Sequence, residues 1–538
     1  MARSGRIAAL GACALTLSLA GLVSRARAGA GPPQLFETAD RCQACHNGLV
    51  TPSGRDVSIG LDWRASMMAH SARDPYWQAA VRREVLDHPK AQAAIEHECS
   101  RCHMPMAHWS QVTGGGRGEV FSNLGPAGPS AALAGDGVSC TVCHQIRRDG
   151  LGTRASFTGH FVIDTTTALG ERPVFGPFAI DKGLQRLMHS ASAFRPEEGV
   201  HVQSSELCAT CHTLYTHALD EDGRAVGELP EQVPYLEWRH SAYRETQSCQ
   251  SCHMPVVEEP VRLSSTLGEP RSGVSRHTFR GANFWMLRVL NRYRDELGVL
   301  TLPAELELAA GDTTDQLQRD TASLALERLE RRDGQLIVEL AVGNRAGHKL
   351  PTAYPSRRVW LHLAVRDAEG RVVFESGAFT PEGRISGNDN DEDPAAYEPH
   401  YPEITSADQV QIYESIMVDR RGAVTTGLLS GVRYAKDNRL LPDGFDKATA
   451  EPDISVHGAA ATDPDFLAGG DRVRYRIPIE GIHPLSVEAE LLYQSIGYRW
   501  AHNLRQRPAA LTDRFVRYYE SMSHVTAERL AQARAEAR

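Results

Sequence analysis

Ten of the eleven cysteines stand in five copies of one short motif, in which two cysteines separated by two residues are followed at once by a histidine. Cys-x-x-Cys-His is the attachment sequence of c-type haem, because two thiols reach two vinyl groups of one porphyrin while the adjacent imidazole ligates its iron. Disulfides do not explain the histidine after every pair, and zinc sites built from two pairs would leave one pair over. The sequence therefore predicts five covalently bound haem c groups, attached through Cys42, Cys45, Cys99, Cys102, Cys140, Cys143, Cys208, Cys211, Cys249 and Cys252.

Each motif also supplies one iron ligand, namely His46, His103, His144, His212 and His253. Five six-coordinate irons would need five further ligands, and the remaining histidines are the candidates. His70 is predicted to share one helix face with Trp63 and Met67, directed into the core. His277 precedes a helix that we expect to begin at Asn283.

Three further histidines complete the predicted set of sixth ligands. His201 and His240 stand seven and nine residues ahead of Cys208 and Cys249. His348 lies in the loop Gly347-His-Lys-Leu-Pro-Thr352 between two strand patterns, where the alternative is a histidine that hydrogen-bonds the backbone. If one of these fails, the reserves are His97, His160 and His217.

The N-terminus predicts export. Arg3 and Arg6 precede an apolar stretch from 7 to 23, and Ala-Arg-Ala at 26–28 is typical of a signal-peptide cleavage site. Cys13 lies in this stretch and resembles a lipoprotein box only superficially. No later segment has the eighteen apolar residues of a membrane span. We expect a periplasmic or extracellular protein, in keeping with covalent haem attachment.

The charge balance excludes some partners. The chain has 58 Lys and Arg against 67 Asp and Glu, a net charge of -9, and removal of the four arginines of residues 1–28 makes it -13. The negative potential of such a chain disfavours binding to nucleic acid and favours association with basic redox partner proteins. The oligomeric state cannot be read from it.

The sequence texture predicts an α+β multidomain fold. Residues 29–280 form a haem domain of loops and short helices, and 281–330 a helical connector broken at Gly311-Asp312. Alternating runs at 335–342, 359–366, 371–375, 409–418, 471–479 and 486–493 predict an antiparallel β-sandwich-like domain over 331–500. A C-terminal helix, 513–537, is expected within 501–538.

One acidic run is a candidate cation site. Asp389, Asp391 and Asp393 alternate in Asn-Asp-Asn-Asp-Glu-Asp, as calcium ligands do, but the spaced glutamate and fixed glycine of an EF-hand are missing. The alternative is a solvated acidic turn.

The haem region resembles the multihaem cytochrome c superfamily that includes the tetrahaem cytochrome of ammonia oxidisers, octahaem hydroxylamine oxidoreductase and pentahaem nitrite reductase. The resemblance covers about residues 36–290 and rests on the five motifs, the Cys-His-Met-Pro tails at Cys102 and Cys252, the Trp63–His70 segment and Glu237-Trp238. The Gly-His-x-x-Pro-Thr loop looks like one in β-domains fused to such cytochromes. The resemblance implies closely stacked, mostly bis-histidine haems, although the Cys-x-x-Cys-Lys motif of pentahaem nitrite reductase is missing.

Two function classes follow. The first is an electron-transfer protein whose haems are all six-coordinate. The second is an oxidoreductase in which one haem keeps an open face for a small nitrogen or sulfur compound, with His, Arg or Tyr nearby to deliver protons. The sequence identifies no catalytic residue for the second class.

Overall fold

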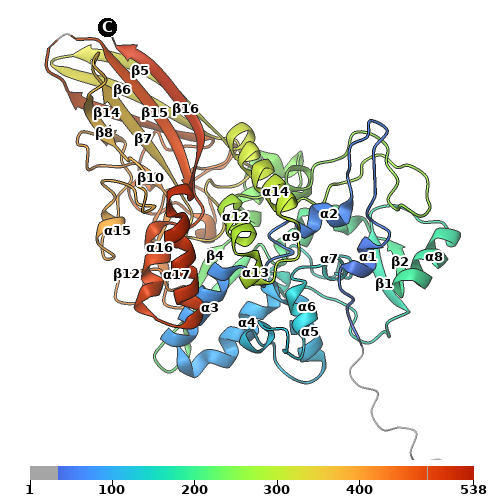
Figure 1. The fold of residues 1–538 in the computed structure, drawn as a ribbon. Coiled ribbons are helices and arrows are strands. Elements are labelled where there is room, and N and C mark those ends of the chain that lie inside the picture. Colours follow the sequence, from blue (N-terminus) through green and yellow to red (C-terminus); the bar gives the residue numbers. More distant parts are fainter. Residues whose placement is uncertain (1–33, 482, 538) are drawn as a thin grey trace, which may run out of the picture.

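A computed structural model describes residues 34–481 and 483–537. The predicted signal peptide and Cys13 lie outside the described residues. The fold combines helices and strands in an α+β arrangement, with an N-terminal half of short helices and loops and a C-terminal half dominated by sheets (Figure 1). Within the described ranges, no helix is both long enough and apolar enough to cross a membrane.

The N-terminal half contains eleven short helices and two small sheets in its described part. The longest helix, α3, begins at Pro75 behind Asp74, whose carboxylate accepts the N–H groups of Tyr76 and Trp77 and so caps the helix. The helices are α1 (Asp40–Gln43), α2 (Ile59–Arg64), α3 (Pro75–Asp87), α4 (Gln92–His103), α5 (Pro105–Thr113), α6 (Ala131–Gly135), α7 (Cys140–Cys143), α8 (Lys182–Ser192), α9 (Ser205–Ala209), α10 (Pro234–Arg239) and α11 (Cys249–His253). A parallel pair, β1 (Arg172–Gly176) and β2 (Phe194–Glu198), and an antiparallel pair, β3 (Leu214–Leu219) and β4 (Ala225–Gln232), are its only named strands. The expectation of loops, short helices and little sheet is confirmed for these residues.

The connector begins as expected but differs at its end. α12 (Phe284–Arg292) follows Asn283, and α13 (Arg294–Leu297) and α14 (Pro303–Gln316) come next. The predicted break at Gly311 is wrong, because α14 continues through that residue. The predicted helical connector also ends early, because β5 (Ala322–Arg332) already pairs with the first predicted strand.

Two sheets of the C-terminal half share one hydrophobic core. The first sheet has the strand order β5–β6–β14–β9, and the second has the order β10–β7–β15–β16, with β8 also paired to β7. Inward residues of β6, β7, β14 and β15 meet in this core, as in a sandwich. The bounds are β6 (Gln335–Asn344), β7 (Arg358–Arg366), β8 (Val372–Ser376), β9 (Glu403–Ile404), β10 (Ile412–Tyr413), β14 (Gly470–Pro478) and β15 (Leu485–Gln494). A third, small sheet contains β11 (Ser415–Val418), β12 (Val424–Thr425) and β13 (Arg433–Asp437).

The prediction of one C-terminal helix from 513 to 537 is wrong over its second part. After α15 (Asp389–Glu392) and α16 (Tyr498–His502), helix α17 covers Ala510–Met522, and the chain then forms β16 (Ala527–Ala537). β16 pairs antiparallel with the whole of β15, and Leu530 is buried in the core. The edge of the sheet therefore overrides the helix preference of this alanine- and glutamate-rich segment.

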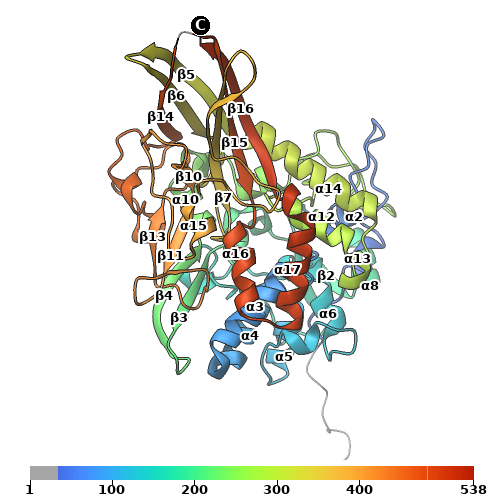
Figure 2. The same cartoon turned by 60° about the vertical axis from the view of Figure 1, so that its left-hand side comes forward.

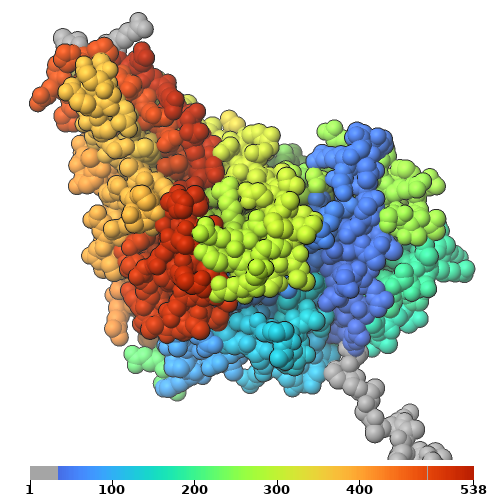
Figure 3. All heavy atoms as spheres, viewed as in Figure 1, coloured from blue at the N-terminus to red at the C-terminus, as the bar shows by residue number. Residues whose placement is uncertain are grey.

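The two halves are in contact over a broad interface. Figures 2 and 3 show the C-terminal half and α17 against α3 and the β3–β4 pair of the N-terminal half. α17 packs on α3, and Arg514 of α17 donates a hydrogen bond to Gln78 of α3. One core cluster includes Tyr76 and Tyr235 from the N-terminal half together with Phe515 from the C-terminal half.

Candidate haem centres

Each of the five motifs lies in a short helix or begins in one. The second motif is the last turn of α4, the fifth motif forms α11, and the two cysteines of the third motif are the ends of α7. The first motif starts inside α1, and the fourth starts inside α9. The ten motif cysteines have free thiols, as haem attachment requires.

One cavity of about 1300 Å³ collects most of these groups. The thiols and the motif histidines of the first four motifs line it, and the fifth motif borders it through Gln250 and Met254. Most of its lining is apolar, and Leu187 and Leu267 are 41% and 56% exposed there. Flat apolar groups would cover such side chains, so the lining fits porphyrins.

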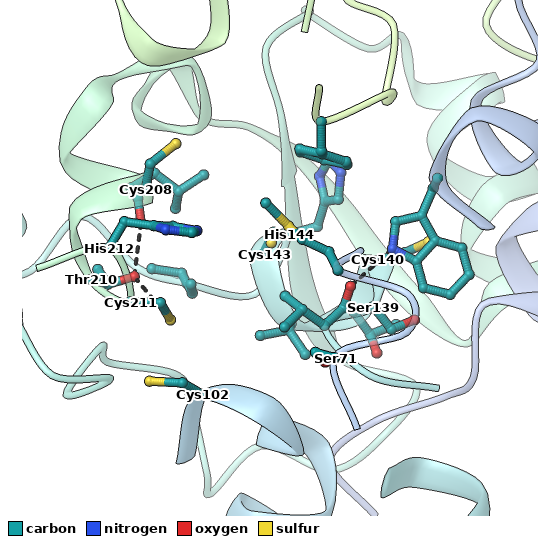
Figure 4. A pocket seen from close by; sticks show the side chains of 18 of the residues that line it. Ser71, Cys102, Ser139, Cys140, Cys143, His144, Cys208, Thr210, Cys211 and His212 are labelled. Atoms are coloured by element: carbon teal, nitrogen blue, oxygen red, sulfur yellow. Dashed lines mark hydrogen bonds between the residues drawn. The ribbon is translucent and has the colours of Figure 1, made fainter. Parts of the chain in front are cut away.

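Several of the motifs are neighbours in space, with thiols of different motifs close together. The thiols of Cys42 and Cys140, of Cys102 and Cys211, and of Cys208 and Cys249 lie close enough for the members of each pair to shift each other's pKa. The contact with Cys211 and burial raise the pKa of the Cys102 thiol. Figure 4 shows Cys102 and Cys143 in the same cavity as the fourth motif. The fourth motif is therefore adjacent to the second and the fifth.

Four of the five motif histidines are oriented by the backbone. Nδ1 of His46, His103 and His144 donates to the carbonyls of Leu263, Ser71 and Phe175, at 2.6, 3.2 and 2.6 Å, and Nδ1 of His253 donates to the carbonyl of Arg280. This bond leaves Nε2 as the free nitrogen, which is how proteins orient metal-binding imidazoles. Burial lowers the pKa values of all four, to about 4 for His103. The imidazoles are neutral at physiological pH, as iron ligation requires.

Two motif histidines face a second imidazole. The ring of His277 lies 6.4 Å from the ring of His144 at an interplanar angle of 18°, and the ring of His348 lies 6.3 Å from that of His253 at 12°. Nδ1 of His277 bonds the carbonyl of Ser275, and Nδ1 of His348 bonds that of Lys349. Two metal–nitrogen bonds of about 2 Å and half the width of each imidazole ring add up to roughly 6 Å between the ring centres. Both pairs therefore have the spacing and the free nitrogens that one metal between them needs.

The other three predicted sixth ligands are not placed in this way. His70 is buried, but its Nε2 lies 3.2 Å from the hydroxyl of Thr301. Nε2 of His201 donates to the carbonyl of Ile146, and Nδ1 of His240 donates to that of Leu236. Among the described residues, a second imidazole is paired only with His144 and His253. Ligation by His70, His201 and His240 stays a prediction without supporting geometry.

A buried ion network holds the His348 loop against the N-terminal half. The side chain of Lys349 is fully buried and donates to Asp437 at 2.8 Å, and Arg439 bonds both Asp437, at 2.8 Å, and Glu237 of α10, at 2.9 Å. Glu237 also accepts the N–H of Lys349 at 3.1 Å. Burial would raise the pKa of Asp437, but the charges of Arg439 and Lys349 lower it well below its usual range. The network fixes His348 opposite His253.

Sequence reasoning missed a cluster of acids and phenols beside the second motif. The rings of Tyr76 and Tyr354 lie 5.8 Å apart in an edge-to-face contact, and with Glu84 and Glu231 they line the cavity. Burial raises the pKa of Glu231 to about 8 and also that of Glu84. Burial and the charges of these two glutamates raise the pKa of the Cys99 thiol, which shows that they lie close to it. These residues come from α3, β4 and the loop before β7, so spacing along the sequence could not reveal them.

The predicted calcium site is not supported. Asp391 lies fully buried in a bidentate ion pair with Arg358, at 2.8 and 2.9 Å, and accepts the N–H of Ile385. Both oxygens of Asp391 are therefore occupied by hydrogen bonds within the protein. The carboxylates of Asp389 and Asp393 do not come together with that of Asp391 around a possible ion position. The alternation along the sequence does not survive because residues 389–392 form a short helix.

A second group of possible metal ligands is a hydrogen-bond network. In the described part of the chain, only His400, Asp463 and Asp471 converge, with Nε2 of His400 3.0 Å from Asp463 and 3.9 Å from Asp471. Gln411 and Asn438 donate to Nδ1 of His400 at 2.8 and 3.1 Å, and backbone N–H groups on their oxygens fix these amide orientations. Nε2 therefore carries the proton and donates it to Asp463, which leaves no lone pair for a metal.

Comparisons with known proteins agree with this geometry. No family model matches the chain, and neither does any curated protein. Among solved structures, it is similar to a penta-haem cytochrome c552 from Thermochromatium tepidum, with a TM-score of 0.55 and 17% identity over 94% of this chain and 100% of that chain. The fold of this chain is thus similar to that of this cytochrome, and the match extends over both halves.

Proposed function

We propose that this chain is an exported pentahaem cytochrome c that carries electrons through closely packed, mostly bis-histidine haems. The facing pair His253 and His348 carries the proposal, because the two rings come from different halves of the molecule and meet at the spacing of two ligands on one iron. Haem, when attached, supplies one-electron chemistry. The adjoining thiols of different motifs support close packing of the groups they would hold.

Haem content tests the proposal. A pyridine haemochrome assay on protein purified from a host that attaches haem c should give five haems per chain. Replacing Cys140 and Cys143 with alanine should leave four. A colourless, zinc-loaded protein would contradict the proposal.

Export is part of the proposal, and its basis is the sequence of residues 1–28. The mature protein should be found in the periplasm or medium and should begin at Gly29. An unprocessed N-terminus on haem-loaded protein would contradict the predicted cleavage.

One observation favours a second candidate function, an oxidoreductase acting on a small nitrogen or sulfur compound. Beside the second motif lie the phenols of Tyr76 and Tyr354 and the carboxyl of Glu231, whose pKa burial raises to about 8, and His103 faces no second imidazole in the described structure. Such groups can deliver protons to a bound molecule. Azide or cyanide added to the ferric protein should then change the spectrum of one haem. An unchanged spectrum would contradict the oxidoreductase function and leave electron transfer as the only candidate of the two.

A further inference from the structure

Helix α8 presents an apolar face to the cavity instead of to the protein core. Leu184, Leu187, Met188 and Ala191 recur at the three- and four-residue spacing of one helix face, and all four line the cavity. Ser192 is the only residue of α8 that is fully buried. The helix is well defined, since Asp181 caps it by accepting the N–H groups of residues 183 and 184. A face of this kind needs a large apolar partner.

Two anchors place α8 at the first motif. Arg41, which directly precedes Cys42, donates to the carbonyl of Ala191 at 3.4 Å, near the C-terminal end of the helix. Near the other end, Arg271 donates to the carbonyl of Ala179 at 2.9 Å. Arg271 pairs with Val261 in the hairpin that also provides the Leu263 carbonyl for Nδ1 of His46. α8 is therefore tied on both sides of the His46 site.

The neighbouring third motif needs no ligand from α8, because His277 already faces its histidine, His144. Figure 1 shows α8 beside β1 and β2, on the same side of the molecule as α1. His189, the histidine of α8, does not face the cavity, because its Nε2 bonds the carbonyl of Gly170. On the cavity face, Met188 is the one side chain that carries a ligand atom, and it sits between Leu184 and Ala191.

From these contacts, we infer that α8 lies over the haem of the first motif and that the thioether of Met188 is its sixth ligand, opposite His46. This inference rests on the proposed haem attachment and changes its expected ligand set, because the first haem becomes a histidine–methionine centre. Methionine has an unbranched, adaptable side chain that suits this position. Replacement of histidine by methionine as an axial ligand raises the reduction potential of a c-type haem. The first haem should then accept electrons more readily than the haems of the third and fifth motifs, whose histidines face a second imidazole.

Spectroscopy of the full-length, haem-loaded protein tests this ligand. The ferric protein should show the weak long-wavelength charge-transfer band of methionine-ligated haem c. Met188→Leu, which keeps the volume and apolarity of the side chain, should abolish the band. Met188→His should keep all haems low-spin but lower one midpoint potential in a redox titration. Met254→Ala, at another methionine of the cavity, is the control and should keep the band.

The outcomes separate this inference from the proposed function. Fewer than five haems per chain would contradict the haem attachment itself. Five haems without the band, or a band that survives Met188→Leu, would overturn the assignment of Met188 and leave the pentahaem proposal standing. Loss of the band in Met188→Leu with five haems retained would support it.

Discussion

At the scale of single residues, His348 joins the two halves of the molecule. His348→Ala should leave the haem of the fifth motif without its imidazole on that side, so one haem should become high-spin or bind an added small ligand. The measurement is the ferric absorption or electron paramagnetic resonance spectrum, together with the potential of that haem.

The matched control for this variant is His362→Ala. His362 lies within β7, where it bonds Glu490 and Glu375 at 3.2 and 3.0 Å, away from the motif histidines. This variant should keep the wild-type spectrum. If both variants keep a fully low-spin spectrum, His348 is not a haem ligand.

Glu231 should make stability depend on pH. Burial raises its pKa from 4.5 to about 8, so the folded chain holds a proton that the unfolded chain releases above pH 4.5. The free energy of unfolding should therefore fall as pH rises between these values, by up to about 1.4 kcal/mol per pH unit from this group. Denaturant titrations of the wild type and Glu231→Gln at several pH values should show a shallower fall in the variant.

The control for Glu231 lies in the same strand. Glu228 is exposed and pairs with Arg154 at 2.5 Å, so Glu228→Gln should leave the slope as in the wild type. Equal slopes for the wild type and Glu231→Gln would show that Glu231 is ionised in the folded protein.

Attachment residues leave a clearer signal in the sequence than sixth ligands do, for a physical reason. Attachment needs groups that are adjacent in the chain, so its spacing is visible. A sixth ligand arrives from a distant segment, and only the fold decides whether an imidazole such as that of His201 faces iron or a carbonyl. His348 became a candidate because an isolated histidine in an apolar loop between strands has few other roles, and the fold places its ring opposite that of His253.

At the scale of elements, the loop between β6 and β7 depends on its buried charges. Asp437→Asn would remove the negative charge that balances the buried positive charges of Lys349 and Arg439. Loss of one partner of such a buried ion pair lowers the free energy of unfolding by about 3–5 kcal/mol. We expect a lower midpoint of thermal unfolding and a perturbed spectrum of the fifth haem. Glu480→Gln, at an exposed position, should change neither property.

The periodicity of the sequence predicted elements well where burial alternates. β6 alternates buried and partly buried residues, β14 alternates mostly buried and exposed ones, and both are found where the pattern indicated them. β16 was missed because its alanine, glutamate and arginine residues favour a helix in isolation, and only the open edge of β15 makes it a strand. The same reasoning explains α14, where a single glycine costs too little to end a packed helix.

At the scale of the whole molecule, the cavity belongs to both halves. Tyr354 and Arg357 from the loop before β7, and Leu428 and Leu429 from the loop between β12 and β13, line it together with the motif residues. Glu84 of α3 accepts the N–H groups of Leu428 and Leu429 at 2.9 and 3.3 Å, which seals this side. The C-terminal half is thus a wall of the proposed haem compartment, and its removal should expose the second and fifth motifs to solvent.

The net charge of the molecule should control its encounter with a redox partner. Without residues 1–28 the chain carries -13, so a basic electron-transfer protein should react rapidly at low salt. Raising the ionic strength shortens the screening length from about 10 Å at 0.1 M to about 3 Å at 1 M, and the second-order rate should fall steeply. Stopped-flow reduction of the ferric protein by a small basic cytochrome measures this rate, and an uncharged chemical reductant serves as the control. A rate with the basic partner that is as insensitive to salt as the control would show that the acidic surface does not guide the encounter.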